Sequence, residues 1–360
     1  MSSFNEADVL PESIESLIQQ GIDVYVLDNG STDGSLSVAQ SYLRKGVVGV
    51  ETILFEEGGR EIYNWSGILA RKQQIAQTLD HDWFIHVDAD EIRMSPWEDV
   101  SLKEAIYRVD QSGCNLINFK LFNFRLHNNS SDVGLIESRF EYFSEAESFD
   151  SIQVKAWKAS YSLDLVSSGG HFAMIPNPKL SPFRFLLKHY PLRSVVQGVR
   201  KVNLERKARF SAAEKAKNWH RQYDELSSDE QKLAEQLFWP MDELTLFDVA
   251  QQRRQICQEA QQIVALSQDI QAVIGQVRCA ADWAHWMSEG SGIDMSEALL
   301  LAEIMSELLL IKDAQLLRAT AKDCLSKEAY SAVLACIAKE SAVQFLEGKP
   351  GLAEWHLFTH

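Results

Sequence analysis

The sequence predicts an α/β protein in which a mostly parallel sheet is flanked by helices and is followed by an α-helical C-terminal region. Three observations support this fold class. Strand-like and helix-like segments alternate through residues 10–92, two of the strands run into acidic turns, and the chain after Arg193 is helix-prone almost throughout. Alternation of this kind favours right-handed crossovers and a parallel sheet with helices on both faces.

The first elements are indicated by periodicity and by the residues that end them. Apolar residues at helical spacing, stopped by Gly21, predict a helix that ends near Gln20. A strand is expected at residues 24–27, and a second helix at residues 36–43. Together they give a helix, a strand and a helix in succession.

The alternation continues and then changes character. The β-branched run at residues 47–55 predicts a strand, residues 68–79 a third helix, and residues 83–87 another strand. From residue 115 to about residue 157, apolar runs between polar loops predict added, partly antiparallel strands, while residues 240–360 show helical periodicity. We therefore expect two domains, residues 1–224 and residues 225–360.

The composition excludes several classes of function. With 360 residues, 46% of them hydrophobic, the chain can bury a core. The 35 basic residues against 51 acidic ones give a net charge of −16, which argues against a broad surface for nucleic acid or anionic lipid. Five cysteines without a CxxC pair suit a reducing compartment, and no apolar segment is long enough to cross a bilayer. These features predict a cytoplasmic protein.

Acidic residues follow two strands of the expected sheet. Asp28 ends one strand, and Asp88 and Asp90 end another. Ligands of parallel α/β sheets bind beyond the carboxyl ends of the strands, so we expect the three carboxylates to converge, with Asp90 exposed at its strand end. Such a set of oxygens suits Mg²⁺ or Mn²⁺, which would hold a diphosphate. The alternative is that these residues only cap the following turns.

Several segments resemble glycosyltransferase family 2, whose members have the GT-A fold, a Rossmann-like arrangement. The resemblance rests on "NEADVLPE", "VLDNGSTDGS", "LARK" and "HVDADEI", and continues in "SSGGHF", "HYPLRS" and "NWHRQYD" up to residue 224. The later motifs are similar to those of the branch that acts in bacterial polysaccharide assembly. The resemblance implies transfer of a hexosyl or similar unit from a nucleotide-diphosphate sugar, with a UDP-sugar as the first expectation.

The resemblance also implies roles for individual residues around the donor. Asp28 would contact the nucleoside, with Asn29, Gly30 and Ser31 shaping the turn. Arg71 would lie near the nucleotide, although a solvated helix residue is the alternative. The remaining roles of this kind are contact with ribose and metal for Asp88, ligation of the metal for Asp90, a third metal ligand for His171, and steadying of the diphosphate for Lys155, His189 and Arg193.

Transfer with inversion, which the resemblance implies, requires a carboxylate to deprotonate the acceptor hydroxyl, a hydroxyl of a glycan or another molecule. Six acidic residues between residues 132 and 150 are candidates, and Asp150 and Glu137 are the first to test. Glu91 is expected behind the metal ligands or facing the acceptor.

Two other functions remain open at this point. One is a non-catalytic protein of the same fold whose helical tail serves as an interaction module. The other is a metal-dependent phosphohydrolase that uses Asp88 and Asp90. The tail itself could form the core of a bundle or make a homo-oligomer.

The start of the sequence departs from the family pattern. An apolar strand would precede "NEAD", but only Met1 to Phe4 stand there. At about 3.3 Å per residue four residues give only a stub. We therefore expect a truncated N-terminal strand, unpaired backbone groups on its neighbour, and weaker nucleotide binding than the motifs promise.

Overall fold

The computed structural model describes residues 1–128, 130, 134–144, 152–210 and 226–274. The chain divides into two compact units, Met1–Ile175 with Phe183–Ile256, and Pro176–Pro182 with Cys257–His360. The elements discussed below belong to the first unit, and helix α9, Val249–Ile274, begins there and continues into the second. The rest of the predicted helical tail, beyond residue 274, lies outside the described residues.

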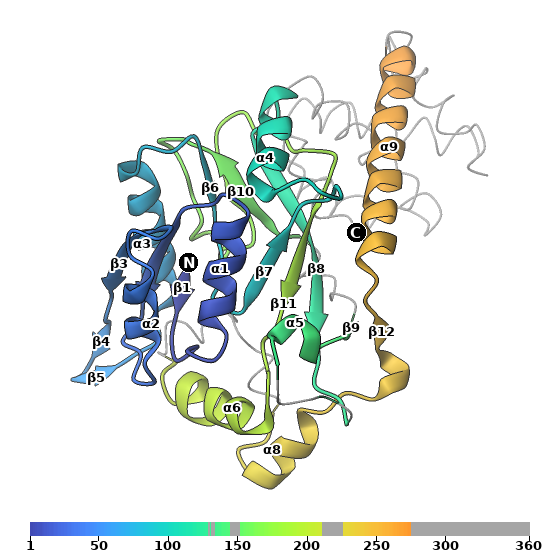
Figure 1. The fold of residues 1–360 in the computed structure, drawn as a ribbon. Helices are drawn as coiled ribbons and strands as arrows, with labels where there is room; N and C mark the ends of the chain where they lie inside the picture. The colour runs from blue at the N-terminus through green and yellow to red at the C-terminus, as the bar shows by residue number, and fades with distance from the viewer. Residues whose placement is uncertain (129, 131–133, 145–151, 211–225, 275–360) are drawn as a thin grey trace, which may run out of the picture. The chain divides into compact units, whose positions relative to one another are not determined.

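The N-terminal part alternates helices and strands as expected (Figure 1). Helix α1 buries Leu10, Ile14 and Leu17 on one face, which is the stripe that the sequence spacing predicts. Its end is set by Gly21, whose φ of 79° is the left-handed conformation that glycine tolerates. The elements of this part are α1 Leu10–Gln19, β2 Val24–Asp28, α2 Ser35–Ser41, β3 Val47–Thr52, β4 Glu56–Glu57, β5 Arg60–Glu61, α3 Trp65–Thr78 and β6 Trp83–Ile85.

The next part adds a second set of strands. It comprises β7 Glu91–Met94, α4 Leu102–Gln111, β8 Leu116–Phe124, α5 Ile136–Arg139, β9 Tyr142–Ser144, β10 Val154–Lys158 and β11 Phe185–His189. It closes with α6 Val195–Val199, a π-helix Arg200–Lys207, α8 Glu230–Gln236, a 3₁₀-helix Met241–Glu243 and β12 Thr245–Leu246. The strands β7 and β11 were not predicted, because short runs with charged residues carry no alternating pattern.

The strands form two larger sheets. Strand β1, Ser2–Ser3, pairs parallel with β2, and β2 pairs parallel with β3. The second sheet has the order β12-β9-β8-β10-β6, with β11 pairing with β7 and β8. In it β11 runs parallel to β8, whereas β10 is antiparallel to β6 and β8, as expected for the added strands.

The short strand β1 joins the two sheets by hydrogen bonds to both neighbours. Leu27 donates its backbone N–H to Met1 on one side, and Ser2 donates to Val87 on the other. The prediction of unpaired backbone groups is therefore wrong for the carboxyl end of β2. Residues 1–3 are enough to form backbone hydrogen bonds there with residues 27–29 on one side and residues 87–89 on the other.

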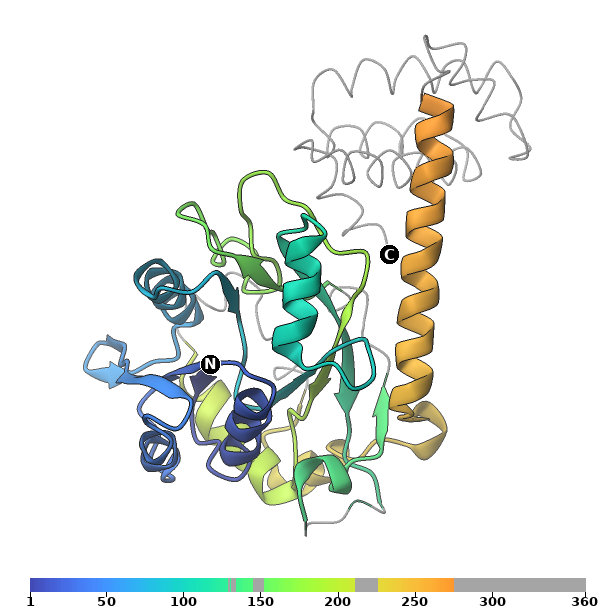
Figure 2. The same cartoon turned by 45° about the horizontal axis from the view of Figure 1, so that its top comes forward.

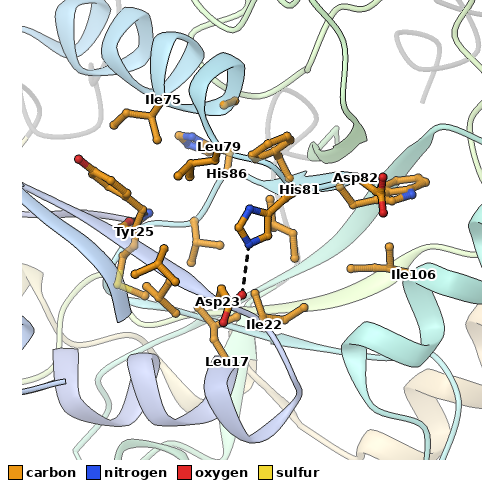
Figure 3. A pocket seen from close by; sticks show the side chains of 18 of the residues that line it. Leu17, Ile22, Asp23, Tyr25, Ile75, Leu79, His81, Asp82, His86 and Ile106 are labelled. Atoms are coloured by element: carbon orange, nitrogen blue, oxygen red, sulfur yellow. Dashed lines mark hydrogen bonds and ion pairs between the residues drawn. The ribbon is translucent and has the colours of Figure 1, made fainter. Parts of the chain in front are cut away.

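Below these residues a cavity of about 450 Å³ separates β2 from β6 (Figure 3). Leu17 and Ile22 line it from one side, and Ile75 of α3 and Leu79, which directly follows α3, line it from the other. The amino group of Met1 opens on this cavity and donates to the backbone oxygen of Tyr25 at 2.7 Å. Burial, followed by the charge of Lys72, lowers the pKa of this amino group to about 4. Within the described residues, the edges of β2 and β6 that line this cavity are not paired with another strand.

The main core lies where α1 and α4 pack on the sheets. Its largest members are Phe119 of β8 and Phe185 of β11, whose rings meet edge to face at 5.9 Å. Val24 and Val26 of β2 belong to the same cluster. Among the described helices, none has an apolar stretch long enough to cross a membrane.

Candidate functional site

The turn after β2 is built around the carboxylate of Asp28, which is 1% exposed. Its Oδ2 accepts the backbone N–H groups of Gly30 and Ser31 at 3.1 and 2.9 Å. Gly30 has a φ of 78°, and a Cβ there would lie 2.5 Å from a methyl of Leu54, so glycine is required. Oδ1 of Asp28 is buried and has no partner among the described residues. One oxygen therefore holds the turn while the other is left for a donor group.

The segment after β1 is tied to the same turn. The side-chain oxygen of Asn5 accepts the N–H of Thr32 at 2.7 Å, and the hydroxyl of Ser35 accepts the N–H of Glu6 at 2.9 Å. The amide of Asn5 donates to Glu205, which follows 200 residues later. The motifs "NEAD" and "NGSTDGS" thus form one unit with the π-helix.

The second acidic turn begins at Asp88, which is held by two donors. Its Oδ1 accepts the hydroxyl of Ser2 at 2.5 Å and lies 3.4 Å from the ammonium of Lys72. Burial alone would raise the pKa of Asp88, but Lys72, His86 and Lys155 outweigh it and hold this pKa well below its usual value. Asp88 is therefore ionised and already neutralised by the protein.

Asp90 is buried, at 7% exposure, so the expectation of an exposed strand-end carboxylate is wrong. Its Oδ2 lies 2.8 Å from the ammonium of Lys201 and 3.8 Å from Nε2 of His189. Burial opposes ionisation, but Lys201, His189 and Arg193 overcome this effect and lower the pKa of Asp90. Since the π-helix covers this carboxylate from a distant part of the chain, sequence spacing could not indicate its burial.

Glu91 lies at the centre of a buried ion cluster. Its two oxygens meet Lys155 at 2.9 Å and Arg93 at 2.6 Å, and it also accepts the backbone N–H of Asp88 at 3.0 Å. Glu91 and Arg93 are 3% and 0% exposed. The cluster fixes the turn from behind, which agrees with a place behind Asp88 and not with an acceptor-facing one.

Arg193 is held by carboxylates of the N-terminal segment. It contacts Glu6 and lies 2.7 Å from Asp8, and it donates to the backbone oxygen of Tyr190 at 3.0 Å. Burial disfavours its charge, but Glu6 and Asp8 raise the pKa of Arg193. In the structure Arg193 pairs with Glu6 and Asp8, and Lys155 pairs with Glu91. The predicted contact of these two cations with the diphosphate stays a prediction.

Two other predicted residues make contacts of their own. Arg71 on α3 forms a two-pronged ion pair with Glu51 of β3, at 2.9 and 2.8 Å. Nδ1 of His171 lies 3.1 Å from the side-chain amide of Gln153. The structure does not bring His171 together with Asp88 and Asp90 as a metal-binding group.

The two candidates for the general base are Glu137 and Asp150. Glu137 on α5 pairs with Lys188 and is 45% exposed on its side chain. Asp150 lies outside the described residues.

The fit of a divalent cation can be judged from Asp88 and Asp90. Both carboxylates already carry an ammonium partner, Lys72 and Lys201, and within the described residues no three His, Cys, Asp or Glu side chains are grouped to hold a metal ion. The described residues in this arrangement therefore do not fit the metal site that the motifs predict.

Three cations of the site, Lys72, Lys201 and Arg209, are not predicted by the sequence pattern. Lys72 is part of "LARK", in which the resemblance points to Arg71, and the other two lie in the basic segment after Arg193. The helical pattern of that segment does not indicate which of its basic side chains are buried.

Comparison with known proteins adds two findings. Residues 1–99 match the family model described as glycosyl transferase family 2. The chain is also similar to a solved structure, the crystal structure of S. aureus TarS 1-349 in complex with UDP, at 12% identity and a TM-score of 0.33, with 97% of this chain and 90% of that chain covered. No curated protein matches the chain. Over residues 1–99 the family match confirms the resemblance to glycosyltransferase family 2 read from the motifs, and the alternation of strands and helices there agrees with a GT-A-like α/β fold.

Proposed function

Because residues 1–99 match glycosyl transferase family 2, we propose that the chain moves a sugar from a nucleoside-diphosphate sugar to an acceptor hydroxyl at the carboxyl ends of β2 and β6. The observation that carries this proposal is the buried, unpartnered Oδ1 of Asp28 in a turn built around it. A UDP-sugar is the first donor to test, and the acceptor is a glycan or another hydroxyl compound, as in polysaccharide assembly. The absence of CxxC pairs supports a cytoplasmic setting.

Asp28 supplies the contact with the nucleoside in this proposal. Its Oδ2 is fixed by two backbone N–H groups, so Oδ1 points in one direction and accepts an N–H of the base or a ribose hydroxyl. A hydrogen bond to a preformed charged acceptor is worth about 1.5–3 kcal/mol. The rigid turn therefore gives both affinity and orientation.

The departing nucleoside diphosphate gains negative charge as the sugar leaves, and fixed positive groups stabilise such charge. Lys72 and Lys201 supply ammonium groups at the second acidic turn. Asp88, Asp90 and Glu91 hold Lys72, Lys201 and Lys155 in place through ion pairs. A divalent cation at Asp88 and Asp90 would have to displace these ammonium groups.

Inversion at the sugar requires a carboxylate base, and Glu137 and Asp150 remain the proposed candidates. The side chain of Glu137 is 45% exposed, so an acceptor hydroxyl can reach its carboxylate. Glu137→Gln should lower kcat while leaving donor affinity unchanged.

The proposal is tested by binding and turnover with a panel of nucleotide sugars, each with EDTA and with Mn²⁺. Asp28→Asn keeps an oxygen for the N–H groups of Gly30 and Ser31 but replaces the unpartnered oxygen with an NH₂ group. We expect this variant to bind the nucleotide about tenfold or more weakly at an unchanged melting temperature. Asp99→Asn, at an exposed position, is the matched control.

Three outcomes would change the proposal. Binding of a nucleotide sugar without turnover on any acceptor favours a non-catalytic protein. Release of phosphate without sugar transfer favours the phosphohydrolase. Equal nucleotide affinity in Asp28→Asn and the wild type removes Asp28 from the site.

A further inference from the structure

A buried arginine beside the β2 turn belongs to none of the motifs. Arg209 follows the π-helix, is 9% exposed, and stacks its guanidinium on Phe4 at 3.8 Å from the ring centre. Its Nη2 donates to the side-chain oxygen of Asn29 at 3.1 Å and to the backbone oxygen of that residue at 3.4 Å. This places Arg209 next to the residue that follows Asp28.

The charge of Arg209 is poorly compensated. Its Nε and Nη1 are buried and have no hydrogen-bond partner among the described residues. The buried Arg93 and Arg193, by contrast, each lie against a carboxylate. Burial lowers the pKa of Arg209, and Glu61 counters this effect only in part. A desolvated guanidinium whose hydrogen bonds go to a neutral residue is costly unless an anion completes it.

The backbone of Arg209 is held in place. Its carbonyl accepts the N–H of Tyr63 at 2.8 Å, and the ring of the next residue, Phe210, packs against Tyr63 at 5.9 Å. The guanidinium of Arg206, one turn earlier, stacks on the ring of Tyr63, 4.4 Å from the ring centre. π-Helices such as the one that leads into this segment are frequent at functional sites. Arg209 is therefore a fixed group and not a flexible surface side chain.

Two unpartnered groups of opposite kind thus meet at one turn. Asp28 offers an acceptor, and Arg209 offers N–H donors. A nucleotide carries both complements, because its base and ribose donate while its phosphate oxygens accept. We propose that Arg209 binds a phosphate of the donor nucleotide while Asp28 holds the nucleoside, an assignment that rests on the proposed nucleotide site.

The test compares ligands that differ only in phosphate. Calorimetry with uridine, UDP and inorganic pyrophosphate is done on the wild type, Arg209→Gln and Arg209→Lys, with Arg108→Gln as the control at an exposed arginine. We expect Arg209→Gln to weaken UDP about 10- to 100-fold, to leave uridine within about twofold, and to abolish pyrophosphate binding. Arg209→Lys keeps the positive charge but loses the planar guanidinium with its several N–H donors. Its affinities for UDP and pyrophosphate should therefore lie between those of the wild type and of Arg209→Gln.

The outcomes separate this inference from the proposed function. Equal loss for uridine and UDP, or no loss of UDP and pyrophosphate, overturns the phosphate assignment. If the wild type binds pyrophosphate in an Arg209-dependent way but no nucleotide, the anion site stands and the proposed function fails. If Arg209→Gln does not fold, Arg209→Lys decides: UDP and pyrophosphate affinities equal to those of the wild type overturn the assignment.

Discussion

The ammonium nitrogen of Lys201 lies 2.8 Å from Oδ2 of Asp90, and the two side chains are only 2% and 9% exposed. The same ammonium lies 3.0 Å from Oε1 of Glu6. Lys201 therefore joins three segments: the loop after β1, the second acidic turn and the π-helix. An interior contact of this kind makes the acidic turn part of the structural core of the domain.

The first prediction follows from that contact. Asp90→Asn should destabilise the protein by about 1.5–3 kcal/mol, because it removes one of the carboxylates that pair with the buried ammonium of Lys201. Urea denaturation monitored by circular dichroism measures the change. Asp99→Asn, at an exposed position, should stay within about 0.5 kcal/mol of the wild type.

A second substitution makes the prediction specific. Lys201→Met in the Asp90→Asn background should restore part of the lost stability, because the buried ammonium that lost the charge of Asp90 is gone. Additive losses in the double variant would show that the two side chains do not act as a pair.

The second prediction concerns Glu91. Glu91→Gln should cost about 3–5 kcal/mol, since it leaves Arg93 and Lys155 buried around a neutral amide. The free energy of unfolding in urea is the measurement, and Glu98→Gln at an exposed position is the control. A loss below about 0.5 kcal/mol would mean that the cluster is solvated in solution.

The third prediction concerns pH. Tyr190 is fully buried, stacked on Phe124 at 4.8 Å, and burial, then the charges of Glu137 and Glu12, raises its pKa well above 10.0. Above pH 10 the unfolded chain loses this proton while the folded chain keeps it, so stability is full below pH 10 and falls as pH rises. Urea denaturation from pH 7 to pH 11 should show a shallower alkaline loss for Tyr190→Phe.

Tyr107, which is 57% exposed, provides the control for this measurement. Tyr107→Phe should keep the alkaline slope of the wild type. Identical slopes in all three proteins would show that the hydroxyl of Tyr190 reaches solvent.

The fourth prediction uses the cavity between β2 and β6. Four apolar, β-branched residues joined in front of Met1 should continue β1 along β2 and fill part of the space of about 450 Å³. They would turn the buried amino group into an amide, bury apolar side chains and form hydrogen bonds to β2. We expect a gain of about 2–4 kcal/mol.

The melting temperature of this extended protein is compared with that of one extended by four Gly and Ser residues. Amide hydrogen exchange of residues 24–26 and 83–85 reports whether the added segment pairs. Equal melting temperatures and unchanged exchange in the two extended proteins would contradict the prediction.

The elements that the sequence predicted well are those with a local signal. Expected strands at residues 24–27 and 83–87 correspond to β2 and β6, and the expected helix at residues 68–79 corresponds to α3. Periodicity and stop residues such as Gly21 act over a few residues, so they can be read directly. The turn at Asp28 was also predicted, because its residues are contiguous.

The ion pairs of the candidate site had no such signal. Lys201 is 111 residues from Asp90, and Arg193 is 187 residues from Glu6. Which cation meets which carboxylate depends on how the π-helix packs against the acidic turn, and no local pattern encodes that choice. For the same reason the alternate aspartates gave no indication that Asp88 and Asp90 contact Lys72 and Lys201.

The two-residue strand β1 has a consequence for motion. It provides the described backbone pairing between the β1–β2–β3 sheet, which carries Asp28, and Asp88 with the strand before it. Regions with few such bonds open below the free energy of global unfolding, as separate cooperative units. Breaking the pairs of Ser2 would separate the two walls of the proposed donor site while the helices still hold the core. A nucleotide that bridges Asp28 and the second acidic turn should therefore slow hydrogen exchange at residues 1–3 and their partners more than elsewhere.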